Sequence, residues 1–267
     1  MSGSSMTKRS PWQIQQAVLF ALFIRELKTR VGGRWLGGFW LLLEPLVHVT
    51  LLMMLVTLLR RITAPGIEVP VFLVTGLMPF FIFKDLSVRL MDAIDANRGL
   101  FNYRQVKPID ALATRALLEV TLRSVVYALV LAALGWFGFH VIPARPLELI
   151  GVSAVLVMLG ASFGLLFAVA TDEFPKARVF IRMLFGMPLY LASGVIFSVH
   201  RLPPDVQVWL QWNPVLHLIE LSRASFFPSY RAMQGVSLHY PAGLAVALAF
   251  FGMALYRVRR DQLMSAN

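Results

Sequence analysis

Histidine, acidic and lysine side chains are the groups of this 267-residue chain that could carry out metal or covalent chemistry. None of the five histidines is followed by glutamate, which excludes the HExxH zinc motif. The spacing His217-x-x-Glu220 puts an imidazole and a carboxylate on neighbouring turns of a helix. One such pair is a weak signal for a metal, and a hydrogen-bonded structural pair is the favoured interpretation. The sequence therefore predicts no metal site.

The lysines bear on nucleotide chemistry. None of the five follows a glycine, so the chain has no phosphate-cradling Walker loop and is not expected to hydrolyse a nucleoside triphosphate by that route. A membrane-embedded enzyme would need several acids or metal ligands at one depth, and its only candidates are Glu44, His48 and Glu119. We therefore expect a chain that is not an enzyme and binds no cofactor itself.

The composition indicates a membrane protein. Hydrophobic residues make up 58% of the chain, charged residues make up 15%, and cysteine is absent. Soluble domains average roughly 45–50% apolar and about 25% charged residues. The net charge of +11 lies in short basic clusters between apolar runs, not on one solvated face. We interpret it as a signal of membrane topology and expect no nucleic-acid partner.

Six apolar stretches are long enough to cross about 30 Å of hydrocarbon as helices. They are residues 37–59, 69–91, 112–139, 147–170, 179–199 and 241–256. Basic residues concentrate before the first stretch and after the second, fourth and sixth, which by the positive-inside rule places both termini in the cytoplasm. The prediction is an all-α integral membrane protein with six transmembrane helices, forming a single membrane domain over residues 1–267.

Two patterns within these spans concern helix packing. Asp85, Arg89 and Asp92 are spaced so that one arginine meets two carboxylates on a single helix face. Gly160 and Gly164 form a small-xxx-small pair that permits close contact with another helix. The pattern does not identify that helix.

Residues 10–35 form the first of two elements that are not expected to cross the membrane. Their uninterrupted apolar part, residues 17–24, is too short to span, and Arg25, Lys28 and Arg30 follow it. This pattern suits an amphipathic interfacial helix on the inner surface, with its cations at the lipid headgroups.

Residues 203–232 form the second element that is not expected to cross the membrane. We predict that it is a periplasmic re-entrant hairpin before the last span. We expect two short helices, at 204–212 and 214–227. Asn213 is expected to cap the second helix and Pro214 to take its first position, where a missing N–H costs nothing.

A polar row follows within the second hairpin helix. His217, Glu220 and Arg223 are spaced three residues apart, so that each neighbours the next. The row could line a vestibule or pin the hairpin to neighbouring helices. We expect these residues at the outer mouth of a path, with Glu220 and Arg223 as a mutually neutralising pair. Exchanging the two charges should then restore more function than either single change.

Residues 97–110 form a loop on the cytoplasmic side that mixes aromatic and basic side chains. The loop is long enough for a short surface helix that Pro108 ends. Exposed aromatic groups beside cations are typical of a surface that docks a partner. The candidate contacts are Arg98, Leu100, Phe101, Tyr103, Arg104 and Lys107.

The chain resembles the permease subunit of type-2 ABC exporters, most closely the permeases that export capsular polysaccharide from Gram-negative bacteria. Three motifs carry the resemblance together with the six spans and a basic tail: RELKTR at 25–30, GGFWLLLEP at 37–45 and WNPVLHLIELSR at 212–223. It covers nearly the whole chain.

The resemblance implies partners and roles. It implies a homodimer in the bacterial inner membrane, two separate ABC ATPase subunits that hold ATP and Mg, and a lipid-linked glycan as substrate. A periplasmic co-polymerase or adaptor and an outer-membrane export protein are implied as further partners. Residues 98–107 would form the coupling helix seated in the ATPase, and the helix with Arg25, Lys28 and Arg30 would brace the dimer.

Two alternatives stay open at this point. A permease of the same architecture could move another cargo, such as O-antigen, teichoic polymer, lipid or drug, and a membrane-embedded enzyme is the third class. If the cargo is a glycan, aromatic faces that stack on sugar rings should line its path. The candidates for the path are Trp40, Phe80, Phe81, Phe83 and Tyr190.

Overall fold

The computed structural model describes residues 10–31, 37–59 and 67–264, and these residues form helices and loops without any strand. Residues 32–35 of the predicted interfacial helix lie outside this range. The α-helices are α1 (Pro11–Val31), α2 (Gly37–Leu59), α3 (Val69–Leu90), α4 (Ala93–Asn97), α5 (Pro108–Trp136), α6 (Pro146–Glu173), α7 (Ala177–Leu184), α8 (Met187–Ala192), α9 (Pro204–Leu210), α10 (Pro214–Phe226) and α11 (His239–Met264). Two 3₁₀ turns, η1 (Arg98–Leu100) and η2 (Val199–Arg201), complete them.

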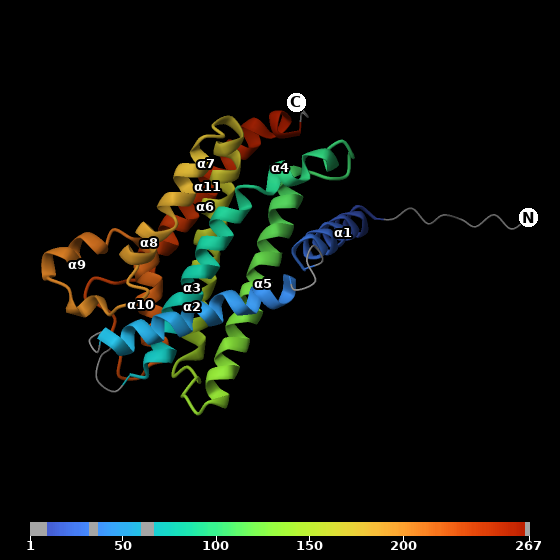
Figure 1. Cartoon of the computed structure of the whole chain (residues 1–267). Coiled ribbons are helices and arrows are strands. Elements are labelled where there is room, and N and C mark those ends of the chain that lie inside the picture. The colour runs from blue at the N-terminus through green and yellow to red at the C-terminus, as the bar shows by residue number, and fades with distance from the viewer. Residues whose placement is uncertain (1–9, 32–36, 60–66, 265–267) are drawn as a thin grey trace, which may run out of the picture.

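Four helices of the described residues, α3, α5, α6 and α11, are long and apolar enough to cross a membrane. They pack into one bundle, with α6 against α3 and α11, and α5 against α3 (Figure 1). Helix α3 is buried along almost its whole length, which makes it the centre of the bundle. The predicted all-α membrane fold is therefore confirmed in this form.

Helix α2 has the bounds of the first predicted span but runs across α3 and α5 instead of alongside them (Figure 1). It is not among the four candidate spans found in the described residues. The six-span topology accordingly stays a prediction.

The glycine pair of α6 identifies its packing partner as α3. A Cβ atom added at Gly164 would lie 2.7 Å from Leu90 Cβ, and one added at Gly160 would lie 3.3 Å from the Phe83 carbonyl oxygen. The absence of side chains at both positions lets the two backbones approach closely.

The fifth predicted span, 179–199, is wrong as a continuous helix. The structure divides it into α7 and α8, with Gly186 between them in a non-helical conformation (φ −85°, ψ −124°). Pro188 explains the break, because its ring nitrogen has no hydrogen with which to continue the helix. After α8 the chain turns at Gly194, whose φ of +63° is the left-handed conformation that glycine adopts without strain.

The two short helices predicted for 203–232 are confirmed as α9 and α10. Asn213 caps α10 as expected, since its side-chain oxygen accepts a hydrogen bond from the Val215 N–H at 3.0 Å. Helix α10 packs against α6 and α3. Figure 1 places α9 and α10 toward one end of the bundle, and α4 and α7 at the other.

The predicted helix within 97–110 is displaced toward the N-terminus. The helical residues are those of α4 and η1, which end at Leu100, and the following residues form turns. Pro108 does not end this helix but begins α5, where a proline fits the first turn.

Candidate functional site

Arg223 lies at the centre of a fully buried polar cluster at the hairpin end of the bundle. Its side chain is completely inaccessible to solvent. The guanidinium donates hydrogen bonds from Nη1 to the Gly194 carbonyl oxygen at 2.8 Å and from Nη2 to the Val195 carbonyl oxygen at 2.6 Å. Its Cζ atom also lies 3.8 Å from the centroid of the Phe72 ring. One arginine thus holds the chain after α8 against both α3 and α10.

Gly76 of α3 makes room for this arginine. A Cβ atom at position 76 would lie 2.4 Å from Nη2 of Arg223 and 2.7 Å from the Val195 carbonyl oxygen. Real Cβ atoms do not approach other atoms so closely. Any side chain at this position would therefore displace the arginine or the turn it holds.

Glu220 has its own partners in this cluster. Its Oε1 accepts a hydrogen bond from the Tyr230 hydroxyl at 2.6 Å, and its Oε2 accepts one from the Met233 N–H at 3.2 Å. Arg223 Nη1 lies 3.7 Å from Glu220 Oε1, so the predicted ion pair is present. The strongest hydrogen bonds of both residues, however, go to other groups. The ion pair is therefore one of several contacts of these two residues, and the expectation that the two charges can be exchanged stays a prediction.

His217 and Asn213 fasten the rest of the row. His217 Nδ1 accepts a hydrogen bond from the Ser237 N–H at 3.0 Å, and Nε2 lies 2.8 Å from the Gln211 carbonyl oxygen. This arrangement fits the tautomer protonated on Nε2. Asn213 Nδ2 donates to Ser193 Oγ at 2.9 Å. His217, Glu220 and Arg223 are all buried, so the row pins the hairpin and does not line an open vestibule.

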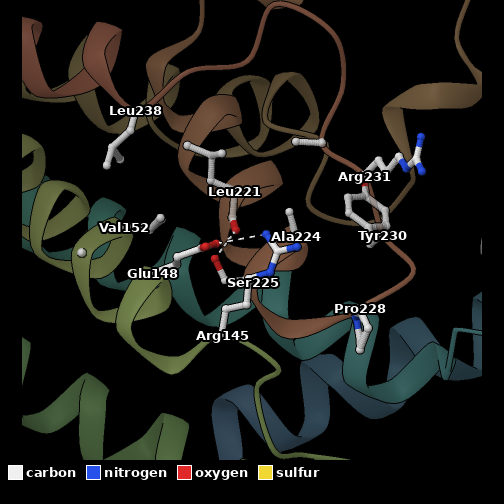
Figure 2. A pocket seen from close by; sticks show the side chains of 12 residues that line it. Arg145, Glu148, Val152, Leu221, Ala224, Ser225, Pro228, Tyr230, Arg231 and Leu238 are labelled. Atoms are coloured by element: carbon white, nitrogen blue, oxygen red, sulfur yellow. Dashed lines mark hydrogen bonds and ion pairs between the residues drawn. The ribbon is translucent and has the colours of Figure 1, made fainter.

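A cavity at this end, the hairpin pocket, has a volume of about 680 Å³. Figure 2 shows Arg145 and Glu148 on one wall, and Tyr230 and Arg231 on the other. Arg145 Nη1 and Glu148 Oε2 are 3.3 Å apart, and both side chains are exposed. The hydroxyl of Tyr230 is the same one that binds Glu220. A wall of the pocket is thus connected directly to the Arg223 cluster.

A smaller aromatic cavity of about 200 Å³ lies between α2, α3 and α8. Phe80, Phe81 and Tyr190 line it, and these are three of the five residues predicted for the path. The rings of Phe80 and Tyr190 meet edge to face at 5.2 Å, and His48 Nε2 lies 3.1 Å from the Tyr190 hydroxyl. Lys84 adds a cation to the wall.

The other two path candidates lie elsewhere. Phe83 points into the helix packing, where its ring stacks on Phe185 with a centroid distance of 5.8 Å. Trp40 is 54% exposed on α2. Neither residue lines the aromatic cavity.

At the opposite end, residues 93–107 form the α4 segment, which ion pairs tie to α6 and α7. Arg98 Nη2 lies 2.7 Å from Asp95 Oδ1 and also binds Asp172 of α6. Asp95 pairs with Arg178 of α7 as well. Burial raises the pKa of Asp95, but hydrogen bonds from Arg98 and Arg178 outweigh it and hold the pKa below its usual value. The carboxylate therefore stays charged at neutral pH.

The predicted docking residues of the α4 segment do not share one environment. Phe101 is buried in the core, at 6% exposure, so the expectation that it is an exposed contact is wrong. Leu100 is half-buried, and Arg98 is held by its two carboxylates. Tyr103 is 66% exposed, and Arg104 and Lys107 are exposed with it. Of the predicted docking residues, these last three are therefore the exposed ones.

Helix α1 is fastened to the α4 segment through Asn97. Arg25 Nη1 donates to Asn97 Oδ1 at 2.8 Å, and Asn97 Nδ2 donates to Glu26 Oε1 at 2.9 Å. Arg115 of α5 donates to both carboxylate oxygens of Glu26 at 2.8 Å. Lys28, in contrast, is exposed. Local sequence gives no signal for Asn97, since a single asparagine at the end of a short helix has no distinctive pattern.

Inside the bundle, a ladder of ion pairs connects α1, α5 and α3. Arg30 pairs with the buried Glu119, and Arg89 Nε lies 3.7 Å from Glu119 and 3.6 Å from Asp85. Asp85 pairs in turn with Arg123. Asp92 does not take part, because it pairs with Arg182 of α7 at 2.7 Å. The predicted Asp85–Arg89–Asp92 ladder is therefore correct only in its first half.

The three residues that were the only candidates for an enzyme site have separate partners and do not come together. Glu119 binds arginines, His48 lies beside Tyr190, and Glu44 is 57% exposed and 3.8 Å from Arg123. Within the described parts of the chain, no three histidine or acidic side chains come together in a way that could hold a metal ion.

Comparison with known proteins gives consistent matches. The family model described as ABC-2 type transporter matches residues 17–227. The chain is 39% identical over 258 residues to the polysialic acid transport protein KpsM of Escherichia coli, covering 97% of this chain and 99% of KpsM. It is 30% identical over 233 residues to the capsule polysaccharide export inner-membrane protein CtrC of Neisseria meningitidis serogroup B, covering 84% and 86%. It is 23% identical over 253 residues to the O-antigen export system permease protein RfbA of Myxococcus xanthus, covering 92% and 94%.

Proposed function

The chain belongs to the ABC-2 type transporter family and is an inner-membrane permease for capsular polysaccharide export, and from this premise we propose how it assembles and works. Two copies form the channel, and two separate ATPase subunits bind ATP and Mg below it. The cargo is a lipid-linked glycan. A periplasmic adaptor or co-polymerase and an outer-membrane export protein continue the route. The observation that carries this proposal is the 39% identity to KpsM over 97% of the chain.

We propose that all six predicted spans cross the membrane and that both termini are cytoplasmic. The fifth span then consists of α7 and α8, with the break at Gly186 at membrane depth. Broken helices are tolerated there where protein buries them, and the Arg223 cluster supplies partners for the carbonyl groups that follow α8. Helices α9 and α10 form the periplasmic re-entrant hairpin.

The proposed path of the glycan passes the aromatic cavity. Phe80, Phe81 and Tyr190 offer aromatic ring faces and edges, and the Tyr190 hydroxyl and His48 offer hydrogen bonds to sugar hydroxyls. The exposed Trp40 of α2 is a further candidate for the path in the dimer. Such a site binds sugar rings without covalent chemistry, as transport requires.

The proposed site of coupling is the exposed part of the α4 segment. Tyr103, Arg104 and Lys107 would seat in the ATPase subunit. Movement there would pass through Arg98 to α6 and through Asn97 to α1, because these contacts tie the segment to both helices. In this role α1 braces the permease at the inner membrane surface.

We expect the double substitution Tyr103→Ala with Arg104→Ala to weaken co-purification of the ATPase subunit at least about tenfold, since exposed aromatic and arginine contacts dominate interface energies. Export should fall with it. Membrane insertion should be unchanged, because both side chains lie outside the core. The measurement is quantitative pull-down of the ATPase with the tagged permease.

The matched control is Phe137→Ala, which removes an aromatic side chain that is 77% exposed at the far end of α5. It should leave the pull-down unchanged. Phe101 is kept intact in both proteins because it is buried. Full retention of the ATPase by the double variant would contradict the proposed coupling site, and failure of the wild-type chain to bind any ATPase would contradict the proposed function.

The hairpin predicts a labelling pattern. Single cysteines introduced at Pro204 and Ser229, which are both exposed, should each react with a membrane-impermeant thiol reagent from the periplasm. The natural chain has no cysteine, so the background is clean. Labelling of only one of the two positions would mean that residues 203–232 cross the membrane once.

A further inference from the structure

Lys84 lines the aromatic cavity and is a cation without an acidic partner. It belongs to α3, one of the helices that are long and apolar enough to cross a membrane. All 14 acidic residues of the sequence lie in the parts of the chain that the structure describes, and none of them forms an ion pair with Lys84. A cation within a membrane span is costly, and such residues mark binding sites or substrate pathways.

Two carboxylates of α2 and α3 have Arg123 as a partner instead. Asp85 pairs with Arg123, and Glu44 lies 3.8 Å from the same arginine. Arg123 and Lys84 both lie beside the ring of Phe81, at 5.5 and 5.6 Å from its centroid. The charge of the arginine is therefore compensated within the chain, and the charge of the lysine is not.

The ammonium group of Lys84 turns back along α3. Its Nζ atom lies over the ring of Phe81, one turn earlier in the helix, whereas α3 continues in the other direction to Leu90. A lysine near the end of a membrane helix usually extends its ammonium group toward the lipid headgroups. Lys84 thus holds its charge at the wall of the cavity and not at the headgroups.

Neutral polar groups accompany this cation in the cavity wall. His48 Nε2 and the Tyr190 hydroxyl are 3.1 Å apart, and whichever of them donates to the other, one N–H or O–H of the pair stays free. The volume of about 200 Å³ is smaller than that of complete small-ligand sites, roughly 300–1,000 Å³, so the cavity accommodates one group of a larger molecule. An ammonium group with such a donor beside it suits a carboxylate or a phosphate.

We propose that Lys84 recognises one anionic group of the lipid-linked glycan, either a sugar carboxylate or the phosphate of the lipid anchor, and thereby selects the cargo. This inference rests on the proposed path through the aromatic cavity. The lysine supplies the counter-charge, while Phe80 and Phe81 contact the adjoining part of the glycan. A neutral cargo leaves the lysine without a counter-charge, so the site discriminates against it.

The test uses the permease assembled with its ATPase subunit and a set of matched fluorescent probes. Each probe is a single-chain lipid that carries a short oligosaccharide of uronic acid. The carboxyl groups are either free or methyl-esterified, and the link to the lipid is either a phosphodiester or an ether. Fluorescence anisotropy gives the dissociation constant of each probe. The wild type should bind the fully neutral probe about ten- to hundredfold more weakly than a probe with the recognised anion, the factor expected for one charge-assisted hydrogen bond.

Lys84→Gln should remove the preference for that anion, and Lys84→Arg, which keeps the charge, should retain most of it. The singly charged probe that loses affinity in Lys84→Gln identifies the ligand as the carboxylate or the phosphate. The matched control is Lys176→Gln, which removes an exposed lysine that does not line the cavity. It should bind all the probes as the wild type does.

Two results would overturn the role of Lys84 and leave the proposed function intact. An unchanged preference in Lys84→Gln would mean that another residue recognises the anion. Dissociation of the Lys84→Gln dimer, measured by mass photometry, would mean that the lysine pairs with a carboxylate of the second copy. Failure of the wild type to bind any of the probes would instead contradict the proposed function itself.

Discussion

Arg223→Ala is expected to abolish export and to lower the free energy of unfolding by about 3–5 kcal/mol, the cost of removing one partner from a buried ion pair. The substitution leaves the carbonyl groups of Gly194 and Val195 without a donor, and Glu220 loses its nearby cation. None of these groups has access to water, because the cluster is buried. Thermal denaturation of the purified protein and capsule export in cells are the two measurements.

Graded substitutions distinguish the geometry from the charge. Arg223→Lys keeps the charge but lacks the planar fork that reaches two carbonyl oxygens, so it should recover only part of the stability. Gly76→Ala leaves the arginine in the sequence, yet its new methyl group would collide with Nη2 and should produce a similar loss. The matched control is Arg231→Ala, an exposed arginine of the hairpin pocket, which should have the stability of the wild type.

The charge exchange Glu220→Arg with Arg223→Glu is expected to remain inactive. A carboxylate at position 223 would face the two carbonyl oxygens that now accept hydrogen bonds, and a guanidinium at 220 would face the Met233 N–H. Both contacts are repulsive. Restoration of export by the exchange, above that of either single variant, would show that the charges matter and the hydrogen bonds do not.

The second large effect is expected for Glu119→Gln. Glu119 is 3% exposed and is the carboxylate that Arg30 of α1 and Arg89 of α3 share. Glutamine leaves Arg30 without an adjacent carboxylate and leaves Arg89 with Asp85 alone, at a cost of about 1.5–3 kcal/mol for hydrogen bonds to charged groups. We expect α1 to loosen and ATP hydrolysis by the assembled complex to become uncoupled from export.

Rescue identifies the cause of this effect. Adding Arg30→Gln removes the cation that has lost its carboxylate partner and should restore part of the stability. Glu148→Gln is the control, because Glu148 is 58% exposed and lies outside the ladder. A Glu119→Gln protein that assembles and exports normally would contradict the proposed role of the ladder. Loss of a covalent turnover with the assembly intact would instead point to an enzyme.

Local rules predicted a large part of the fold. The long apolar runs gave α3, α5, α6 and α11, and the Asn213-Pro214 pair gave the start of α10. The Gly160 and Gly164 spacing predicted a close helix contact, and the structure adds that α3 is the partner. These features depend on residues within a few positions of one another, which is why a single sequence reveals them.

Long-range partners could not be predicted in this way. The acceptors of Arg223 are backbone carbonyls that carry no sequence signature, so the sequence predicts only its neighbour Glu220 as a partner. The burial of Phe101 depends on how the α4 segment folds back onto the bundle, and composition alone made it look like a surface contact. Hydropathy does not reveal the break at Gly186, because one glycine and one proline lower the mean hydropathy of a span only slightly.

The order of synthesis also affects the Arg223 cluster, because the acceptors are made before the donor. Arg223 is made 29 residues after Gly194. At about 5–20 residues per second, the ribosome therefore needs roughly 1–6 seconds to supply the donor after the first acceptor has been synthesised. During that interval the two carbonyl groups lack the donor that they have in the folded protein. The arrival of Arg223 thus supplies the donor for this turn, and the interval before it is when insertion factors or membrane proteases can recognise an unfinished molecule.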